Sequence, residues 1–401
     1  MKVTRGNRLH IGFYGKRNAG KSTLFNLILG QDYSITSEIS GTTTDVNIKS
    51  MELLPIGPVA LMDCAGIDDI NELGEKRIEK TLKTLERTDV AVYVCDFNGL
   101  NLEDESFLEK LNEKKIPCLF IINKTDLDKI SSEELEKIKK YSQNIVQTSC
   151  IEVARDVFVE KFKTELAKIL PKGFTSNINL LPEGLKKGDI AVLVIPIDKE
   201  APAGRVILPQ VQTLRAMLDS SCISIVCQVD ELKKSINLIN GERPKLVITD
   251  SQAFKEVSEI VPSDIALTSY SIIFARLKGD LGAFVEGSKA LDEIQNGDKI
   301  LICESCTHHA IEDDIGKVKI PRLVRQYTGK ELTFEHYSGF DMPKNLSDYK
   351  LIIHCGACMT NRTEVLRRIE LAYGAGTKIT NYGVVIAKCL GILERTIEPF
   401  M

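Results

Sequence analysis

Cysteine and histidine residues gather in two short stretches of the chain. One is Cys306-Thr307-His308, and the other is His354-Cys355-Gly356-Ala357-Cys358. Thiolates suit an iron–sulfur cluster, which normally takes four cysteine ligands. Cys306, Cys355 and Cys358 could therefore hold such a cluster, with a weaker or exchangeable ligand at the remaining position.

A structural zinc site is the main alternative for these cysteines. The spacing C-x-x-C occurs twice, at Cys303/Cys306 and at Cys355/Cys358, and two such pairs can close a tetrahedral zinc site. The long separation between the pairs is unlike the short loops of zinc ribbons and fingers, which weakens this alternative. Six other cysteines lie in apolar runs and are expected to pack as small hydrophobic residues: Cys64, Cys95, Cys118, Cys222, Cys227 and Cys389.

A second set of residues fits phosphate binding. The stretch Gly15-Lys16-Arg17-Asn18-Ala19-Gly20-Lys21-Ser22 follows an apolar strand-like segment, 10–14, and precedes a helix-like one, 23–29. Its glycines let backbone N–H groups turn toward phosphates, Lys21 reaches the β- and γ-phosphates, and the Ser22 hydroxyl can bind Mg²⁺. This P-loop predicts nucleotide contacts from Gly15, Asn18, Ala19, Gly20, Lys21, Ser22 and Thr23.

The sequence Asn123-Lys124-Thr125-Asp126 follows the apolar segment 118–122 and resembles the guanine-reading N-K-x-D motif of the GTPase superfamily. A carboxylate at Asp126 can accept hydrogen bonds from both N1–H and the exocyclic amine of guanine. Adenine offers no such pair of donors, so the wrong base would leave the carboxylate unpaired. The motif therefore favours GTP over ATP.

Three further segments occur in the order expected of a GTPase. Asp63-Cys64-Ala65-Gly66 resembles the D-x-x-G element, in which Asp63 holds Mg²⁺ through water and the Gly66 amide meets the γ-phosphate. Gly41-Thr42-Thr43-Thr44-Asp45 resembles switch I, in which Thr43 would close onto Mg²⁺. Ser149 and Cys150 fall where the last nucleotide motif is expected and would touch the base.

Asn18 and the G-T-T-x-D segment resemble the potassium-activated GTPases of the TrmE type. The resemblance implies that Asn18 helps to hold K⁺ near the phosphates, where positive charge would stabilise the transition state of a slow, cation-stimulated hydrolysis. Ile67 stands where Ras-like enzymes have a glutamine, so another residue must orient the water. Glu72 and Glu75 are the candidates, because they lie close to the switch.

The composition is that of a globular protein of two or three domains, with 401 residues, 43% hydrophobic and 27% charged. A net charge of −4 provides no overall basic field to attract nucleic acid or acidic membranes. Neither a membrane-spanning apolar run nor a secretion signal is evident, so a cytoplasmic protein is expected. Eleven cysteines then favour reduced thiols and metal binding over disulfides.

Alternating strand-like and helix-like segments predict an α/β protein: a P-loop domain with a doubly wound, mostly parallel sheet over 1–170, followed by two smaller α/β domains. A polar linker is expected at 171–177, a dimerisation or scaffold domain at 178–262, and a cluster-binding domain at 263–401. Within the last domain, 266–276 is expected as a strand. The carboxyl ends of strands 299–302 and 351–353 should bring both cysteine stretches to one sheet edge.

A GTPase domain followed by C-x-H and H-C-x-x-C resembles the HydF family, the GTPases that help to mature FeFe-hydrogenase. The resemblance implies a 4Fe-4S cluster on Cys306, Cys355 and Cys358, with His308, His354 or Cys303 as candidates for the fourth ligand. It also implies a homodimeric scaffold that carries a di-iron precursor from radical-SAM maturases to apo-hydrogenase, under the control of GTP. Nucleic acid and membrane are not expected as partners.

Two alternatives stay open. One is a TrmE-like GTPase that acts in tRNA modification and holds a structural zinc, which would need a basic surface that the near-neutral net charge does not support. The other is a redox-sensing GTPase, with a cluster but without di-iron cargo.

Overall fold

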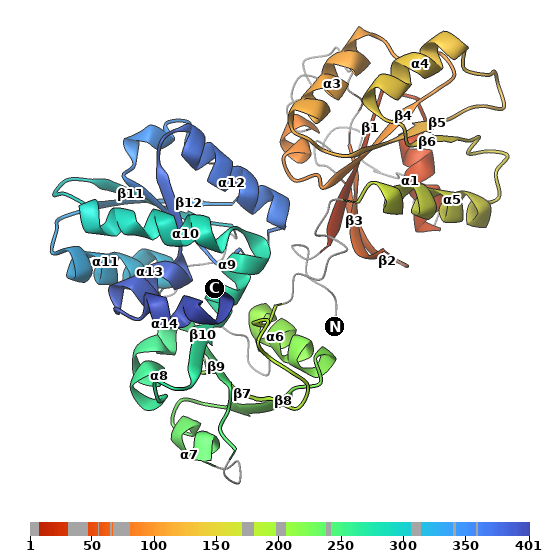
Figure 1. Cartoon of the computed structure of the whole chain (residues 1–401). Helices are drawn as coiled ribbons and strands as arrows, with labels where there is room; N and C mark the ends of the chain where they lie inside the picture. Colours follow the sequence, from red (N-terminus) through yellow and green to blue (C-terminus); the bar gives the residue numbers. More distant parts are fainter. Residues whose placement is uncertain are drawn as a thin grey trace, which may run out of the picture. The chain divides into compact units, whose positions relative to one another are not determined.

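The computed structural model describes residues 8–30, 47–54, 56–64, 66, 81–170, 180–197, 206–237, 242–305, 314–339, 342–357 and 360–401. The chain divides into two compact units, Met1–Asn177 and Ile178–Met401 (Figure 1). Several predicted site residues lie outside the described residues, so their roles stay predictions: Thr43, Glu72, Glu75, Cys306, His308 and Cys358. None of the described helices is both long and apolar enough to cross a membrane.

The first unit contains a six-stranded sheet in the order β2-β3-β1-β4-β5-β6. Its strands are β1 (Leu9–Tyr14), β2 (Asn47–Leu53), β3 (Gly57–Asp63), β4 (Val90–Cys95), β5 (Cys118–Ile122) and β6 (Ile145–Gln147). Strand β2 runs antiparallel to β3, and the other pairs are parallel. Strands β1 and β4 are buried along their whole length, as expected of parallel strands covered on both faces. The predicted doubly wound, mostly parallel sheet is confirmed.

Helices cover both faces of this sheet. They are α1 (Lys21–Leu29), α3 (Leu102–Glu113), α4 (Ser132–Tyr141) and α5 (Arg155–Lys168). Phe25 of α1 and Phe162 of α5 pack around Phe13 on one face. Phe107 of α3 packs against Tyr14 on the other face, because successive side chains of β1 point to opposite sides.

The second unit begins with a parallel four-stranded sheet in the order β10-β9-β7-β8. Its strands are β7 (Ile190–Val194), β8 (Ile223–Cys227), β9 (Leu246–Thr249) and β10 (Ala266–Ser269). Helices α6 (Leu208–Asp219), α7 (Leu232–Asn237) and α8 (Phe254–Ile260) connect these strands along the chain.

The prediction of one strand over 266–276 was wrong. The strand ends at Ser269, and helix α9 (Tyr270–Lys278) begins there because the Ser269 hydroxyl accepts a hydrogen bond from the N–H of Ile272 (3.2 Å). Most of α9 is buried, and a buried helix shows the same unbroken apolar run as a buried strand.

The remaining strands form a third sheet, in the order β12-β11-β13-β14 and wholly parallel. They are β11 (Lys299–Glu304), β12 (Thr333–Ser338), β13 (Leu351–His354) and β14 (Lys378–Asn381). Helices α10 (Leu281–Ser288), α11 (Ile320–Thr328), α12 (Arg362–Gly374), α13 (Tyr382–Cys389) and α14 (Leu393–Ile397) lie around it.

The chain passes from β11 to β12 on one side and then to β13 on the other. The order of the strands therefore reverses between β11 and β13, and ligands of open parallel sheets bind outside the carboxyl ends of the strands at such a point. Both cysteine stretches follow these two strands. Ser305 and Cys355 lie at this edge, and the approach of Cys306 and Cys358 to it stays a prediction.

Candidate functional site

The P-loop connects β1 to α1 through backbone conformations that favour glycine. Gly15 has φ 132° and Gly20 has φ 98°. A Cβ atom at Gly15 would lie 2.1 Å from the carbonyl oxygen of Val94, so a side chain there would displace the neighbouring strand. Asn18, with φ 61°, also adopts the left-handed conformation. The loop is therefore shaped by backbone approach and not by side-chain packing.

Lys21 and Ser22 lie where phosphate and Mg²⁺ would be held. The Lys21 ammonium donates to the carbonyl oxygens of Gly15 (2.9 Å) and Lys16 (2.6 Å), so it spans the loop. The Ser22 hydroxyl donates to Asp63 Oδ2 (3.1 Å). Burial raises the pKa of the Asp63 carboxyl, although the Ser22 hydrogen bond and the Lys21 charge oppose this effect.

The residues around Asp63 fit a magnesium ion. Asp63 Oδ1 is buried and finds no hydrogen-bond partner among the described residues, which leaves one oxygen ready for a bound water or cation. Mg²⁺ prefers oxygen ligands and keeps several waters, as a serine hydroxyl beside a carboxylate allows. Ser22 and Asp63 would hold Mg²⁺, which neutralises phosphate charge when it is bound.

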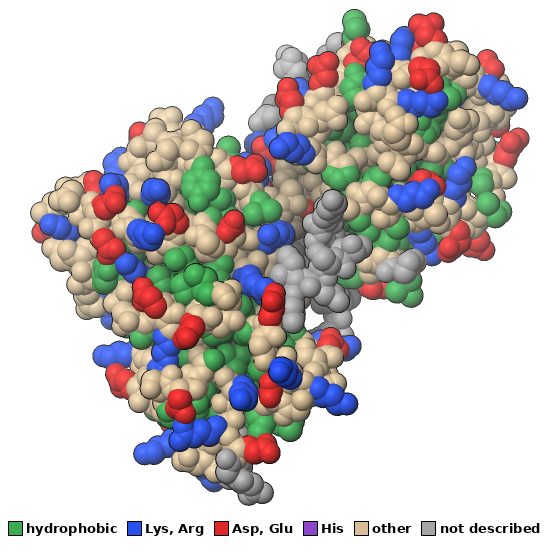
Figure 2. All heavy atoms as spheres, in the orientation of Figure 1, with side chains coloured by type: hydrophobic (Ala, Val, Ile, Leu, Met, Phe, Trp, Pro, Cys, Tyr) green, Lys and Arg blue, Asp and Glu red, His purple; other side chains and the backbone are tan. Residues whose placement is uncertain are grey.

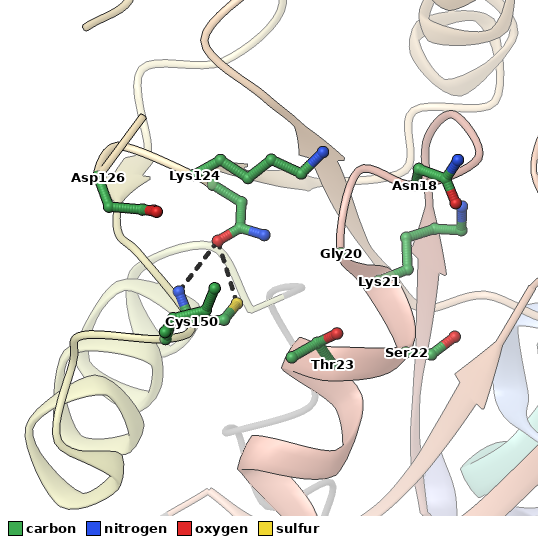
Figure 3. A pocket seen from close by; sticks show the side chains of 10 residues that line it. Asn18, Gly20, Lys21, Ser22, Thr23, Lys124, Asp126 and Cys150 are labelled. Atoms are coloured by element: carbon green, nitrogen blue, oxygen red, sulfur yellow. Dashed lines mark hydrogen bonds between the residues drawn. The ribbon is translucent and has the colours of Figure 1, made fainter. Parts of the chain in front are cut away.

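A cavity of about 360 Å³ joins the P-loop to the predicted base-reading residues. It is lined by Asn18, Gly20, Lys21, Ser22, Thr23, Asn123, Lys124, Asp126, Cys150 and Ile151. Asp126 and Cys150 lie at one end, and Asn18, Lys21 and Ser22 at the other (Figure 3). The two ends suit the base and the phosphates of one nucleotide.

Asn123 ties three of the motifs together. Its Nδ2 donates to the carbonyl of Ala19 in the P-loop (2.9 Å), and its Oδ1 accepts from the N–H (3.2 Å) and Sγ (3.0 Å) of Cys150. Hydrogen bonds of one side chain therefore join the base-reading end to the phosphate-binding end. The next residue, Lys124, adopts the left-handed backbone conformation (φ 60°), and its ammonium lies 3.7 Å from the Asp96 carboxylate.

Ile151 is a lining residue that was not predicted, and the predicted contact of Ser149 with the base stays a prediction. Ile151 is 86% exposed and lines the cavity, so its apolar side chain is available to a flat base. An apolar residue in a polar turn after a strand was the available signal. The Ser149 hydroxyl accepts from the N–H of Glu152 (3.3 Å), so it shapes the turn that presents Cys150 and Ile151.

Gly20→Ala is expected to weaken GTP binding at least about tenfold. A Cβ atom there would lie 2.1 Å from Asn123 Nδ2, and at φ 98° a side chain adds about 1–2 kcal/mol of strain. Titration with a fluorescent GTP analogue measures the effect. Gly57→Ala is the matched control, because Gly57 has φ 106° with no atom within 4 Å of the added Cβ. Equal losses in both variants would contradict the role assigned to Gly20.

The second candidate site lies at the carboxyl ends of β11 and β13. The N–H of Cys355 donates to the carbonyl of Cys303 (2.9 Å). The N–H of Ser305 donates to Cys355 Sγ (3.2 Å), and Ser305 Oγ lies 3.5 Å from the same sulfur. Ser305, the last described residue before Cys306, and Cys355 therefore meet here.

The surroundings of Cys355 favour a thiolate. Burial by itself disfavours the charged sulfur, but the neighbouring His354 imidazole and the N–H and hydroxyl of Ser305 outweigh burial and lower the pKa of Cys355 to about 6. A thiolate is the form that binds metal. No group of three or more His, Cys, Asp and Glu side chains within the described residues could hold a metal ion, but Cys306 and Cys358 lie outside that part of the chain. The donor chemistry of Cys355 fits an iron–sulfur cluster.

Cys303 differs from Cys355. Its side chain is 1% exposed within the apolar core of the third sheet, and burial raises its thiol pKa to about 12. These features favour packing over metal binding. Burial likewise raises the pKa of the six cysteines expected to pack as hydrophobic residues, Cys64, Cys95, Cys118, Cys222, Cys227 and Cys389.

Glu304 is a buried polar residue that was not among the predicted site residues. Its side chain is 6% exposed, and its Oε1 accepts a hydrogen bond from the Tyr382 hydroxyl (3.1 Å). Gly316 leaves room for this pair, since a Cβ atom there would lie 2.3 Å from the Tyr382 hydroxyl oxygen. The only signal in the sequence was an acidic residue at the end of an apolar strand.

Family comparisons now bear on both sites. The Hydrogen maturase F dimerization domain matches residues 180–279, and the Hydrogen maturase F tetramerization domain matches residues 282–399. Together they account for more than half of the chain. The chain belongs to the hydrogen maturase F family. A third match, described as 50S ribosome-binding GTPase, spans residues 10–124, so the N-terminal domain is a GTPase domain. The predicted family resemblance is confirmed.

Similarity to curated proteins covers only part of their length. The tRNA modification GTPase MnmE of Helicobacter pylori (strain J99) is 36% identical over 183 residues, which are 44% of this chain and 38% of that protein. MnmE of Thermotoga sp. (strain RQ2) is 33% identical over 184 residues, 45% of this chain and 40% of that protein. The chain thus spans about two fifths of the length of these relatives.

Solved structures of GTPases are also similar to parts of the chain. A variant of Aquifex aeolicus Era bound to GDP·AlF4⁻ is 21% identical, with a TM-score of 0.34, and the match covers 60% of this chain and 99% of that one. The G domain of the T. maritima FeoB iron transporter is 18% identical, with a TM-score of 0.30, and the match covers 40% of this chain and 99% of that one.

Proposed function

We propose that this protein is a GTPase that matures FeFe-hydrogenase, with a 4Fe-4S cluster on Cys306, Cys355 and Cys358. The observation that carries the proposal is the match of two hydrogen maturase F domains to nearly all of residues 180–399. The thiolate-favouring contacts of Cys355, at the point where the strand order of a parallel sheet reverses, support the cluster.

With this cluster, the protein would act as a scaffold for another metal unit. Three thiolate ligands and one exchangeable position let a bound cluster join an incoming metal unit and later release it. The cargo would be a di-iron precursor, which radical-SAM maturases supply and apo-hydrogenase receives. The dimerization and tetramerization domains provide for assembly of several copies, and the cytoplasm is the proposed place of action.

GTP would regulate the docking of the radical-SAM maturases and apo-hydrogenase. Ser22, Thr43 and Asp63 would hold Mg²⁺ against the phosphates, and Lys21 would neutralise charge in the transition state. Glu72 or Glu75 would orient the hydrolytic water. Binding or hydrolysis would then bias partner docking through the switch segments, which is a coupling between two states.

Potassium is expected to accelerate GTP hydrolysis at least about tenfold relative to sodium, because a cation held by Asn18 would stabilise the charge of the transition state. Asn18→Gly should abolish this difference while keeping the loop, since glycine tolerates φ 61°. Phosphate release in KCl and in NaCl of equal ionic strength measures both. A potassium effect that survives Asn18→Gly would contradict the assignment.

The proposed function is tested by anaerobic co-production of apo FeFe-hydrogenase and radical-SAM maturases with or without this protein. Hydrogen evolution that requires this protein, and that is lost with Cys355→Ser, is the expected result. Equal hydrogen evolution without the protein would overturn the proposal.

Partial similarity to MnmE keeps a second candidate, a GTPase of tRNA modification with a structural zinc. Such a protein should present a basic surface to tRNA. On the face in Figure 2, Lys and Arg side chains are interspersed with Asp and Glu, which favours the first candidate. Bound zinc and salt-dependent tRNA binding would favour the second. A cluster without di-iron cargo would instead indicate a redox-sensing GTPase.

A further inference from the structure

A chain of buried polar groups connects α12 to the end of β13. Arg368 and Glu364 are each 1% exposed, and Arg368 Nε donates to Glu364 Oε1 (2.9 Å). The same guanidinium donates to the carbonyl of Gly339 (2.7 Å) and places a second nitrogen 2.9 Å from His354 Nε2. The guanidinium is thus engaged on three sides.

The chemistry of these contacts determines where His354 carries its proton. A guanidinium nitrogen can only donate, so His354 Nε2 must accept and carries no proton. A carbonyl oxygen can only accept, so Nδ1, 2.7 Å from the carbonyl oxygen of Cys355, must donate. In this arrangement Nδ1 carries the proton that is donated to the Cys355 carbonyl, Nε2 accepts from Arg368, and both nitrogens are occupied.

Glu364 keeps Arg368 in this position. Its backbone N–H is capped by the Asn361 side chain (3.4 Å) in the first turn of α12, where a carboxylate is favoured by the helix dipole. Arg367 also holds it, with two nitrogens each 2.8 Å from a carboxylate oxygen. Burying an ion pair is weak evidence for stability, because desolvation opposes the attraction. A positioning role accounts for the burial better.

The network ends on the backbone of Cys355. Its N–H is bound by the carbonyl of Cys303 and its C=O by His354, so both backbone groups are fixed. The next turn contains Ala357, whose φ of 54° is uncommon for a residue with a side chain. Strained turns of this kind persist where the surroundings over-determine them, often beside a functional group.

We propose that Glu364 and Arg368 are positioning residues that hold His354 as a hydrogen-bond donor to the backbone carbonyl of Cys355. His354 then supports a cluster ligand and does not itself supply the exchangeable ligand. The inference rests on the proposed cluster site. It assigns to two residues of α12, 9 and 13 positions downstream of Cys355, the task of fixing that ligand before metal arrives.

The protein without metal provides the first test. With ¹⁵N-labelled histidine, NMR should show the His354 proton on Nδ1 in the wild-type protein, identified by its loss in His354→Asn. Arg368→Met should move at least about a third of the population to the Nε2–H form, since Nε2 loses its donor. Arg367→Met is the matched control, because it removes a neighbouring guanidinium from Glu364 while leaving the Arg368 contact to His354, and it should keep the Nδ1–H form.

Two outcomes would overturn the inference: an Nε2–H form in the wild-type protein, or an unchanged tautomer in Arg368→Met. Arg368→Lys covers the case in which Arg368→Met fails to fold, since lysine keeps the charge beside Glu364 but its compact ammonium cannot span the three partners that the planar guanidinium reaches. It should shift the tautomer in the same direction.

The reconstituted protein separates this inference from the proposed function. EPR spectra of the reduced wild-type protein should be altered in Arg368→Met and unaltered in Arg367→Met, and His354→Asn should keep the imidazole response. Failure of the wild-type protein to bind iron would overturn the proposed function. A wild-type cluster whose spectrum is the same in Arg368→Met, or whose imidazole response is lost in His354→Asn, would overturn the inference alone.

Discussion

Asp126→Asn is expected to lower GTP affinity at least about a hundredfold and to create affinity for xanthosine triphosphate. The Asp126 carboxylate lines the cavity end opposite the P-loop and would accept two hydrogen bonds from guanine. A hydrogen bond to a charged group contributes about 1.5–3 kcal/mol, and a hundredfold loss corresponds to about 2.7 kcal/mol. An asparagine presents one donor and one acceptor, which match the C2 carbonyl and N1–H of xanthine.

Equilibrium titration with labelled GTP and XTP measures this exchange. Asp128→Asn controls for the change of charge, because it removes a carboxylate two residues after Asp126. The Asp128 carboxylate is exposed and accepts a hydrogen bond from the N–H of Lys129 (2.7 Å). Asp128→Asn should leave both affinities unaltered. If Asp126→Asn binds GTP as the wild-type protein does, guanine is not read by Asp126.

Cys355→Ser is expected to reduce iron from about four to at most about one per chain after anaerobic reconstitution, because a serine hydroxyl stays protonated where the thiol becomes a thiolate. The neighbouring His354 and the Ser305 contacts, which together lower the Cys355 pKa to about 6, would then serve no ligand. GTP affinity should not change, since Cys355 and the P-loop belong to different compact units. Iron analysis and GTP titration of the same preparation give both values.

Cys389→Ser is the matched control for this experiment. Cys389 lies in the same unit, and burial raises its pKa to about 12, as expected of a packing residue. Its variant should keep the full complement of iron. Full iron in Cys355→Ser, or an equal loss in both variants, would contradict the assignment of Cys355 as a ligand.

The GTPase site could be predicted from the sequence because its signals are local. The P-loop and the base-reading motif each follow an apolar strand and Asp63 ends one, and parallel strands carry their carboxyl ends to one edge. The contacts of Asn123 could not be predicted from local motifs. Its partners Ala19 and Cys150 are each more than twenty residues away from it in the sequence.

The second site was predicted less completely. Spacing drew attention to Cys355 and His354, but the burial of Glu364 and Arg368 could not be foreseen, since an acidic and a basic residue four apart usually form an exposed pair on a helix surface. Tertiary packing decided which charges were buried. The same limit explains α9, whose apolar residues fit a strand as well as a buried helix.

Anaerobic reconstitution of the purified wild-type protein with iron and sulfide tests the central claim most directly. Metal analysis for iron and zinc should be combined with EPR of the reduced protein, with and without added imidazole. About four iron atoms per chain, with a spectrum that imidazole alters, is the predicted result for a 4Fe-4S cluster with one exchangeable position. Bound zinc without a cluster would contradict the account.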